Sequence, residues 1–163
     1  MPEHHFDIEH PERPDWLWFV FTSDDGDEWA GAFRQGFNSL WSGIVSGDDR
    51  HFYVLSGGVA YCLDAEVRDV TAILRGLYTS VIAIPGTSDA AFADFNDVTI
   101  AGPAGPIWRT ARLAWDGVRL VSATPLRVTG VAETGHGPAD DRTFQIDLIA
   151  RSFTGGYTKD FPP

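Results

Sequence analysis

The chain has 163 residues, of which 44% are hydrophobic and 13% are aromatic. This length and composition fit one domain with a buried core and exclude a disordered chain. Its 23 acidic and 12 basic residues give a formal net charge of −11. Such a charge repels nucleic-acid phosphates and anionic membranes, and it suits either a basic protein partner or solubility alone.

The sequence shows neither a recognisable targeting signal nor a pair of cysteines. The longest apolar run, residues 16–21, is far shorter than the roughly 18–20 residues that a membrane span needs. Residues 1–10 lack the basic start and apolar core of a signal peptide, so we expect a cytoplasmic protein. Cys62 is the single cysteine, and its apolar neighbours predict a buried side chain without a disulfide or a thiolate zinc site.

The first part of the chain reads as strands joined by polar turns. Residues 1–15 are polar and hold three of the ten prolines, which predicts an extended lead-in. A strand over 16–22, predicted to be covered on both faces, precedes an acidic turn at 23–28. Residues 29–40 fit either a strand or a loose helical turn, and residues 41–46 fit a strand.

A β-hairpin is predicted over residues 51–63, with its turn at Gly57-Gly58. Glycine accepts the positive φ that both central positions of a type I′ turn require. The expected pairs across this hairpin are Val54 with Tyr61 and Phe52 with Leu63.

One short helix is allowed directly after this hairpin. The carboxylate of Asp64 suits a helix N-cap. The apolar residues that follow at helical spacing are Val67, Val70, Ile73, Leu74 and Leu77. Gly76 and the β-branched residues weaken this helix.

Further strands are predicted in the second half of the chain. They cover residues 79–84, 92–101, 126–132 and 143–149, and Gly- and Pro-containing turns separate them. A polar notch at Asp94, Asn96 and Asp97 is typical of a β-bulge within its strand. Residues 133–142 are polar and predict a mobile loop.

The sharpest pattern covers residues 107–120, I-W-R-T-A-R-L-A-W-D-G-V-R-L. Asp116-Gly117 is a pair that type I′ turns prefer, so this segment predicts a second hairpin. Its apolar face would carry Leu113, Trp115, Val118 and Leu120.

Short strands at this spacing indicate an all-β fold. We predict that residues 16–163 form a single domain, either a two-layer antiparallel sandwich or a blade-like pair of sheets, with at most one short helix. The two halves share a weak echo of strands, hairpin and closing strand, but the residue similarity is too slight to define a repeat.

From Phe92 onward, three elements occur in series: Asp94-Phe95, the Gly-rich turn 102–105, and W-R-T-A-R-L-A-W-D-G at 108–117. Here the chain resembles a group of small bacterial proteins of unknown function that share a D-F strand followed by a W-R-T-x-R-L-x-W-D-G hairpin. The resemblance covers about the C-terminal half. It implies a β-rich fold and carries no activity.

Charged residues of this region are the strongest candidates for a binding site. They are Asp94, Asp97, Arg109, Arg112 and Asp116. If the strands that carry them are neighbours, Arg–carboxylate pairs form between them. Such pairs either line a polar pocket for an anionic or sugar ligand, or simply join two strands. In the second case, Asp116 is a residue of the predicted tight turn.

Metal-binding patterns are weaker. The turn at 23–28 offers carboxylates for calcium, but its spacing does not match an EF-hand loop, so an exposed acidic turn is the simpler interpretation. The five histidines are His4, His5, His10, His51 and His136, and none has zinc-motif spacing.

Catalytic motifs are missing as well. Neither G-x-S-x-G nor a phosphate-binding glycine motif occurs, so we assign no catalytic residue, metal ligand or cofactor. Asp94 and Asp97 would suit glycosidase chemistry only at a set separation. The six tryptophans suit core packing, a sugar platform or an interface: Trp16, Trp18, Trp29, Trp41, Trp108 and Trp115. Trp108, which neighbours Arg109, is the best candidate for an interface hot spot.

These features favour a binding protein over an enzyme. The leading hypothesis is a small, acidic protein that acts by contact with a protein partner. A partner with a basic surface would be complementary to its charge. An immunity-type or antitoxin-like role is one version. The alternatives are a ligand-binding or enzymatic domain with a polar pocket around Asp94, Arg109 and Arg112, and a subunit that buries its tryptophan-rich strands against copies of itself.

Overall fold

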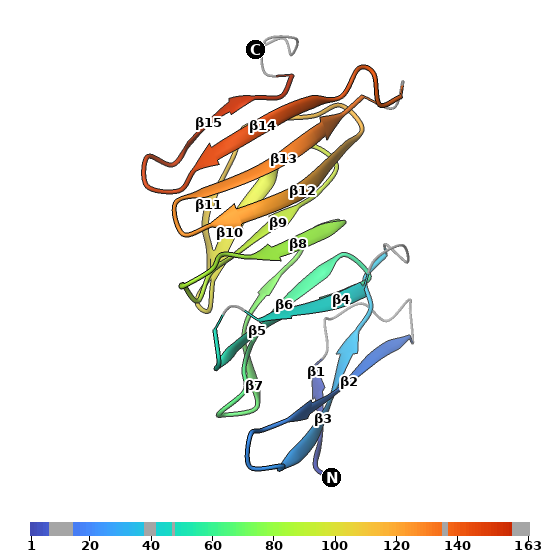
Figure 1. Cartoon of the computed structure of the whole chain (residues 1–163). Coiled ribbons are helices and arrows are strands. Elements are labelled where there is room, and N and C mark those ends of the chain that lie inside the picture. Colours follow the sequence, from blue (N-terminus) through green and yellow to red (C-terminus); the bar gives the residue numbers. More distant parts are fainter. Residues whose placement is uncertain (7–14, 38–41, 47, 135–136, 158–163) are drawn as a thin grey trace.

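The computed structural model describes residues 1–6, 15–37, 42–46, 48–134 and 137–157. In this part of the chain, fifteen strands form four sheets and there is no helix (Figure 1). Accordingly, the described residues contain no helix that could cross a membrane. The predicted all-β fold is confirmed, and the number of layers is four.

The first sheet has three strands and the other three sheets have four each. Sheet 1 contains β1 (Glu3–Phe6), β2 (Trp16–Thr22) and β3 (Glu28–Arg34); sheet 2 contains β4 (Ser42–Ser46), β5 (His51–Ser56), β6 (Val59–Asp64) and β7 (Asp69–Leu74). Sheet 3 contains β8 (Ser80–Ala83), β9 (Ala90–Ala93), β10 (Val98–Gly102) and β11 (Gly105–Arg109); sheet 4 contains β12 (Gly117–Thr124), β13 (Arg127–Glu133), β14 (Arg142–Asp147) and β15 (Ser152–Gly155).

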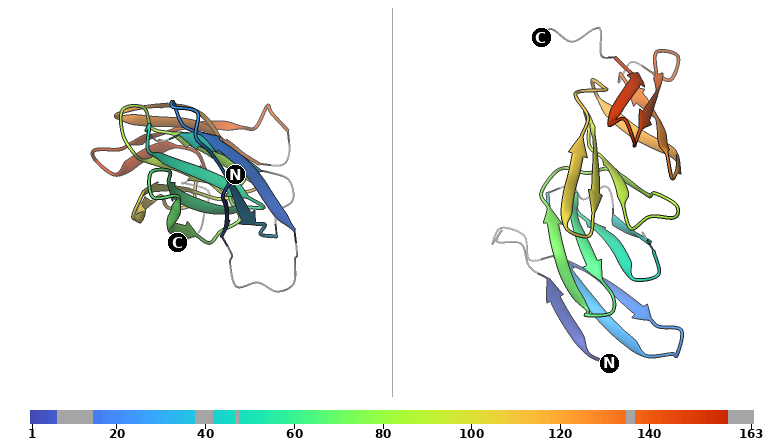
Figure 2. Two further views of the ribbon diagram at one scale, coloured as in Figure 1. Left: turned by 90° about the horizontal axis from the view of Figure 1, so that it is seen from below. Right: turned by 90° about the vertical axis from the view of Figure 1, so that its left-hand side faces the viewer.

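Sheets 2, 3 and 4 are antiparallel meanders in which each strand pairs with the next one in the chain. In sheet 1, β3 lies in the centre, parallel to β1 and antiparallel to β2. The sheets are stacked in chain order, and the first strands of sheets 2, 3 and 4 follow one another along one edge (Figures 1 and 2). The turns β2–β3, β4–β5, β6–β7, β8–β9, β12–β13 and β14–β15 all lie on the left side in Figure 1.

An apolar cluster fills each space between successive sheets. Because side chains alternate along a strand, an inner sheet contributes to two clusters at once. In β5, Tyr53 and Leu55 face sheet 3, whereas Val54 faces sheet 1. In β9, Phe92 faces sheet 2, whereas Ala91 and Ala93 face sheet 4. This two-sided burial explains the nearly continuous apolar runs of these strands.

The hairpin predicted at Gly57-Gly58 is confirmed. Both glycines have positive φ, 58° and 85°, as a type I′ turn requires. The pairs Val54 with Tyr61 and Phe52 with Leu63 are formed as expected.

The helix predicted after Asp64 is wrong, because this segment forms a turn and then strand β7. The Asp64 carboxylate accepts hydrogen bonds from the backbone N–H of Glu66 and Val67, as an N-cap would. The chain reverses at Arg68, whose φ is 57°, and Ile73 then pairs with Tyr61. The β-branched residues favour the strand, and the facing sheet decides the outcome.

The bulge predicted within residues 92–101 is also wrong. The polar notch is the turn between β9 and β10, where Ala93 pairs with Val98. The Asp94 carboxylate accepts from the backbone N–H of Asn96 and Asp97 at 2.7 and 2.9 Å. An Asp at the start of a tight turn serves the backbone in this way.

The segment 107–120 does not form a hairpin. Its first residues belong to β11 in sheet 3, and Gly117 begins β12 in sheet 4, opposite Glu133. Neither Asp116 nor Gly117 has positive φ, so the type I′ turn is absent. Residues 110–116 connect the two sheets, and the N–H groups of Leu113 and Ala114 donate to the Asn96 carbonyl.

The other predicted strands are present with small shifts at their ends. Strands β8, β13 and β14 coincide with or overlap the predicted strands at 79–84, 126–132 and 143–149. Residues 29–34, for which a strand or a helical turn was possible, belong to strand β3. Residues 3–6 of the predicted lead-in form β1, whereas residues 7–14, 38–41, 47, 135–136 and 158–163 lie outside the described residues. Much of the predicted lead-in and part of the predicted polar loop therefore fall outside the described residues.

Candidate functional site

Three of the charged residues singled out in the sequence come together on sheet 3. Arg109 Nε and Nη2 donate to the two oxygens of Asp97 at 2.6 and 2.7 Å, and Nη2 also donates to Asp94 at 3.0 Å. Both carboxylates are largely covered, and Asp97 is buried. Burial raises the pKa of Asp97, although the Arg109 hydrogen bonds act in the opposite direction. The contacts join strand β11 to the β9–β10 turn.

The other residues of that group lie elsewhere. Arg112 Nε donates to the Ala114 carbonyl at 3.1 Å, and its guanidinium stacks 4.8 Å from the centre of the Trp115 ring. Asp116 is exposed at the start of β12, beside Glu133. Trp108 pairs with Ile100 and packs against the cluster between sheets 3 and 4. Successive side chains of a strand point to opposite faces, so Trp108 faces away from Arg109.

The described histidines contact neighbouring side chains, and Cys62 lies in the core. His4 and His5 lie on β1, where their rings contact Trp29 and Trp18, respectively. His51 contacts the carboxylate of Asp48. Cys62 is buried, and burial raises the pKa of its thiol to about 12. Within the described ranges, no group of three or more His, Cys, Asp or Glu side chains is placed to hold a metal ion.

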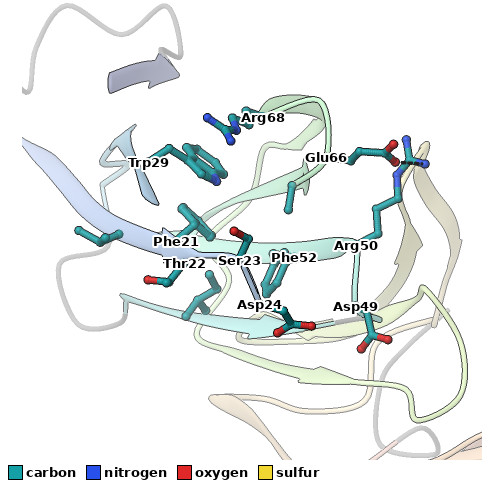
Figure 3. Close-up of a pocket in the computed structure, with 13 residues that line it drawn as sticks. Phe21, Thr22, Ser23, Asp24, Trp29, Asp49, Arg50, Phe52, Glu66 and Arg68 are labelled. Atoms are coloured by element: carbon teal, nitrogen blue, oxygen red, sulfur yellow. Dashed lines mark ion pairs between the residues drawn. The ribbon is translucent and has the colours of Figure 1, made fainter. Parts of the chain in front are cut away.

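A cleft lies between sheets 1 and 2 (Figure 3). It has a volume of about 650 Å³. Three turns meet at its mouth: β2–β3 (residues 23–28), β4–β5 (48–50) and β6–β7 (64–69). We call this feature the acidic cleft, because these turns hold nine carboxylates and two arginines, a formal charge of −7.

Aromatic side chains form the inner wall of the acidic cleft. The rings of Phe21 and Trp29 stack at a centroid distance of 4.2 Å, and Phe52 meets Phe21 edge-on at 5.8 Å. Phe21 and Trp29 are buried, and they belong to the cluster that joins sheets 1 and 2. Ile44 and Ala65 add aliphatic surface to the lining. The wall is thus held rigidly by the core behind it.

Both arginines at the rim are held by carboxylates. Arg50 Nε donates to Asp64 at 2.8 Å, and Arg50 Nη1 lies 2.7 Å from Glu66 (Figure 3). The Arg50 hydrogen bond, aided by backbone N–H groups, holds the pKa of Asp64 below its usual value. Arg68 pairs with Asp27 of the neighbouring sheet. The positive charge at the rim is therefore already neutralised.

Two further carboxylates line the acidic cleft without such partners. Within the described part of the chain, neither Asp24 nor Asp49 forms an ion pair or a side-chain hydrogen bond. Asp48, in contrast, accepts from the backbone N–H of Arg50 and His51 at 2.8 and 2.6 Å. Burial raises the pKa of Asp48, but hydrogen bonds from His51 and Arg50 outweigh it and hold that pKa below its usual value.

This arrangement suits a cationic group attached to an apolar body. The aromatic wall offers dispersion and cation–π contact, and the unpaired carboxylates offer charge-assisted hydrogen bonds. The sequence identifies the turn 23–28 as acidic, but it does not show that turns from two different sheets share one cleft with Trp29 and Phe52.

Comparison with known proteins adds little to this description. Models of protein families give no match, and no curated protein gives a significant one. Among solved structures, the chain is similar to hydrazine synthase of Kuenenia stuttgartiensis, with 13% identity and a TM-score of 0.35. The alignment covers 69% of this chain and 47% of that chain, so this chain spans about half the length of that structure. A similarity at this level carries no functional argument.

Proposed function

We propose that this chain is a protein-binding module that holds a basic segment of a partner protein in the acidic cleft. The observation that carries the proposal is the combination of a fixed aromatic wall with two unpaired carboxylates, Asp24 and Asp49, in one cleft. A segment that alternates arginine or lysine with apolar side chains complements both features.

The charge distribution favours this partner over a neutral one. The three turns at the mouth hold −7 of the formal −11 of the whole chain. Such a concentrated negative field attracts a basic surface from a distance and speeds association at low salt. Masking a basic surface in this way needs no catalytic group, and an immunity-type or antitoxin-like protein is one setting for it.

The experiment is a calorimetric titration with a synthetic peptide of alternating arginine and leucine, compared with its glutamate–leucine counterpart. We expect the basic peptide to bind and the acidic peptide not to bind. Raising salt from about 50 to about 200 mM is expected to weaken binding severalfold, because exposed charges are screened.

A matched pair of double variants tests the location. Asp24→Asn with Asp49→Asn is expected to weaken binding about 10-fold or more. Asp140→Asn with Asp141→Asn, in the β13–β14 connection, changes the net charge equally and is expected to leave the affinity within about 2-fold. An equal loss in both double variants would contradict the proposed cleft, since only the overall charge would then matter.

A further inference from the structure

A second, smaller pocket lies between sheets 3 and 4, apart from the acidic cleft. Its volume is about 240 Å³. The wall is largely apolar and includes Ile84, Ile100, Trp108 and Leu148. Three turns contribute to it, β8–β9, β12–β13 and β14–β15, which lie on the left side in Figure 1. Trp108 packs against the core cluster, so the pocket is largely preformed.

One negative group lines this pocket without a partner. Asp89 is half-buried in the β8–β9 turn, and its backbone is held by Thr87 and Ile84. Its carboxylate, in contrast, has no hydrogen bond or ion pair within the described residues. The carboxylate lies over Gly102, where a Cβ atom would come 2.6 Å from Oδ1. Burial raises the pKa of Asp89, because the group has lost part of its hydration.

One positive group lines the same pocket from the opposite sheet. Arg151 lies in the β14–β15 turn, with φ of 50°, a conformation that few residues other than glycine adopt. No ion pair within 4.0 Å joins its guanidinium to Asp89 or to another carboxylate of the described ranges. Opposite charges thus border one small apolar pocket without neutralising each other.

We infer that this pocket binds a small zwitterion with an apolar side chain, of the class of free aliphatic α-amino acids. Asp89 would accept from the ammonium group, Arg151 would donate to the carboxylate, and the wall around Trp108 would cover the side chain. An amine alone forms no ion pair with Arg151, and a carboxylate alone is repelled by Asp89. This inference is independent of the acidic cleft.

The test uses three related probes, with binding followed by the indole N–H signal of Trp108 in NMR spectra. L-leucine carries both charges, L-leucinamide keeps only the ammonium group, and N-acetyl-L-leucine keeps only the carboxylate. We expect L-leucine to bind with a dissociation constant on the order of 1 mM or lower. Both other probes are expected to bind about 10-fold more weakly or not at all.

Two variants and a control locate the site. Asp89→Asn and Arg151→Gln are each expected to weaken L-leucine binding about 10-fold, whereas Asp140→Asn leaves it unchanged. Circular dichroism and the melting temperature show whether each variant is folded. If L-leucinamide or N-acetyl-L-leucine bound as tightly as L-leucine, the inference would be overturned, since one charged group of the ligand would then suffice. Absence of L-leucine binding to the folded protein would overturn it as well.

Discussion

The guanidinium of Arg68 donates to the carboxylate of Asp27, which lies 41 residues earlier in the chain. This contact links the β6–β7 turn of sheet 2 to the β2–β3 turn of sheet 1 and borders the acidic cleft. Arg68 reaches it from a left-handed backbone conformation, with φ of 57°. Arg68 thereby connects two turns that are both acidic.

A double-mutant cycle measures what this pair contributes. Because Asp27 is 62% exposed, we expect a coupling free energy between Arg68→Ala and Asp27→Ala of about 0.2–1 kcal/mol in urea unfolding. The coupling is expected to shrink as salt increases. A coupling that is insensitive to salt would show that Arg68 acts through packing of its aliphatic stem.

Two tryptophans on opposite faces of sheet 1 are expected to differ strongly in their contribution to stability. Trp29→Ala removes the buried ring that stacks on Phe21, and it should lower the free energy of unfolding by about 3–5 kcal/mol. Trp18→Ala removes a ring that is 48% exposed, and a loss below about 1 kcal/mol is expected. Equal losses in chemical denaturation would argue against the stacking of sheet 1 on sheet 2.

The Arg50–Asp64 pair is expected to make stability depend on acid pH. The pKa of Asp64 is lowered in the folded protein, so its stabilising effect is present above the unfolded value of about 4 and is lost as pH falls through the folded pKa. Asp64→Asn keeps an acceptor for the turn N–H groups and removes the charge. Wild type should be more stable than this variant at pH 7, and the difference should vanish in strong acid. A stability difference between the two proteins that stays constant with pH would show that Asp64 acts through the turn hydrogen bonds and not through its charge.

Gly57 is expected to tolerate alanine less well than another glycine with positive φ. A Cβ atom on Gly57 would lie 2.6 Å from the backbone nitrogen of Gly36, whereas one on Gly86 would meet nothing within 4 Å. Gly86→Ala should therefore lower the free energy of unfolding by about 1 kcal/mol, because alanine is strained at this positive φ. Gly57→Ala should lower the free energy of unfolding by at least about 1 kcal/mol more, because the backbone of Gly36 must move to admit the Cβ atom. Similar melting temperatures for both variants would rule out the close approach of residues 36 and 57.

A similar turn recurs in sheets 2 and 4. Asp64 and Asp147 each accept from the backbone N–H groups two and three residues later, and an arginine with positive φ follows four residues after each. The weak internal echo in the sequence rests on a hairpin in each half, and the second of these, 107–120, does not form. The likeness of the β6–β7 and β14–β15 turns is a separate finding of the structure. With few shared residue types, their likeness is visible mainly in the backbone.

Local chemistry by itself determined the all-β class, most strands and the hairpin at Gly57-Gly58. Two adjacent glycines accept the φ values of one turn, and that turn sets the register of Val54 against Tyr61. Alternation in residues 143–147 likewise predicts β14, because Phe144 and Ile146 must share a buried face.

Tertiary structure decided the features for which two local outcomes compete. Asp116-Gly117 suits a tight turn, but Trp108 pairs with Ile100 in sheet 3, and Gly117 pairs with Glu133 in sheet 4. Asp64 suits a helix N-cap, but Ile73 pairs with Tyr61 and packs against the cluster between sheets 1 and 2. Both candidate pockets depend on turns from separate sheets. Such proximity is a property of sheet stacking, which local sequence does not encode.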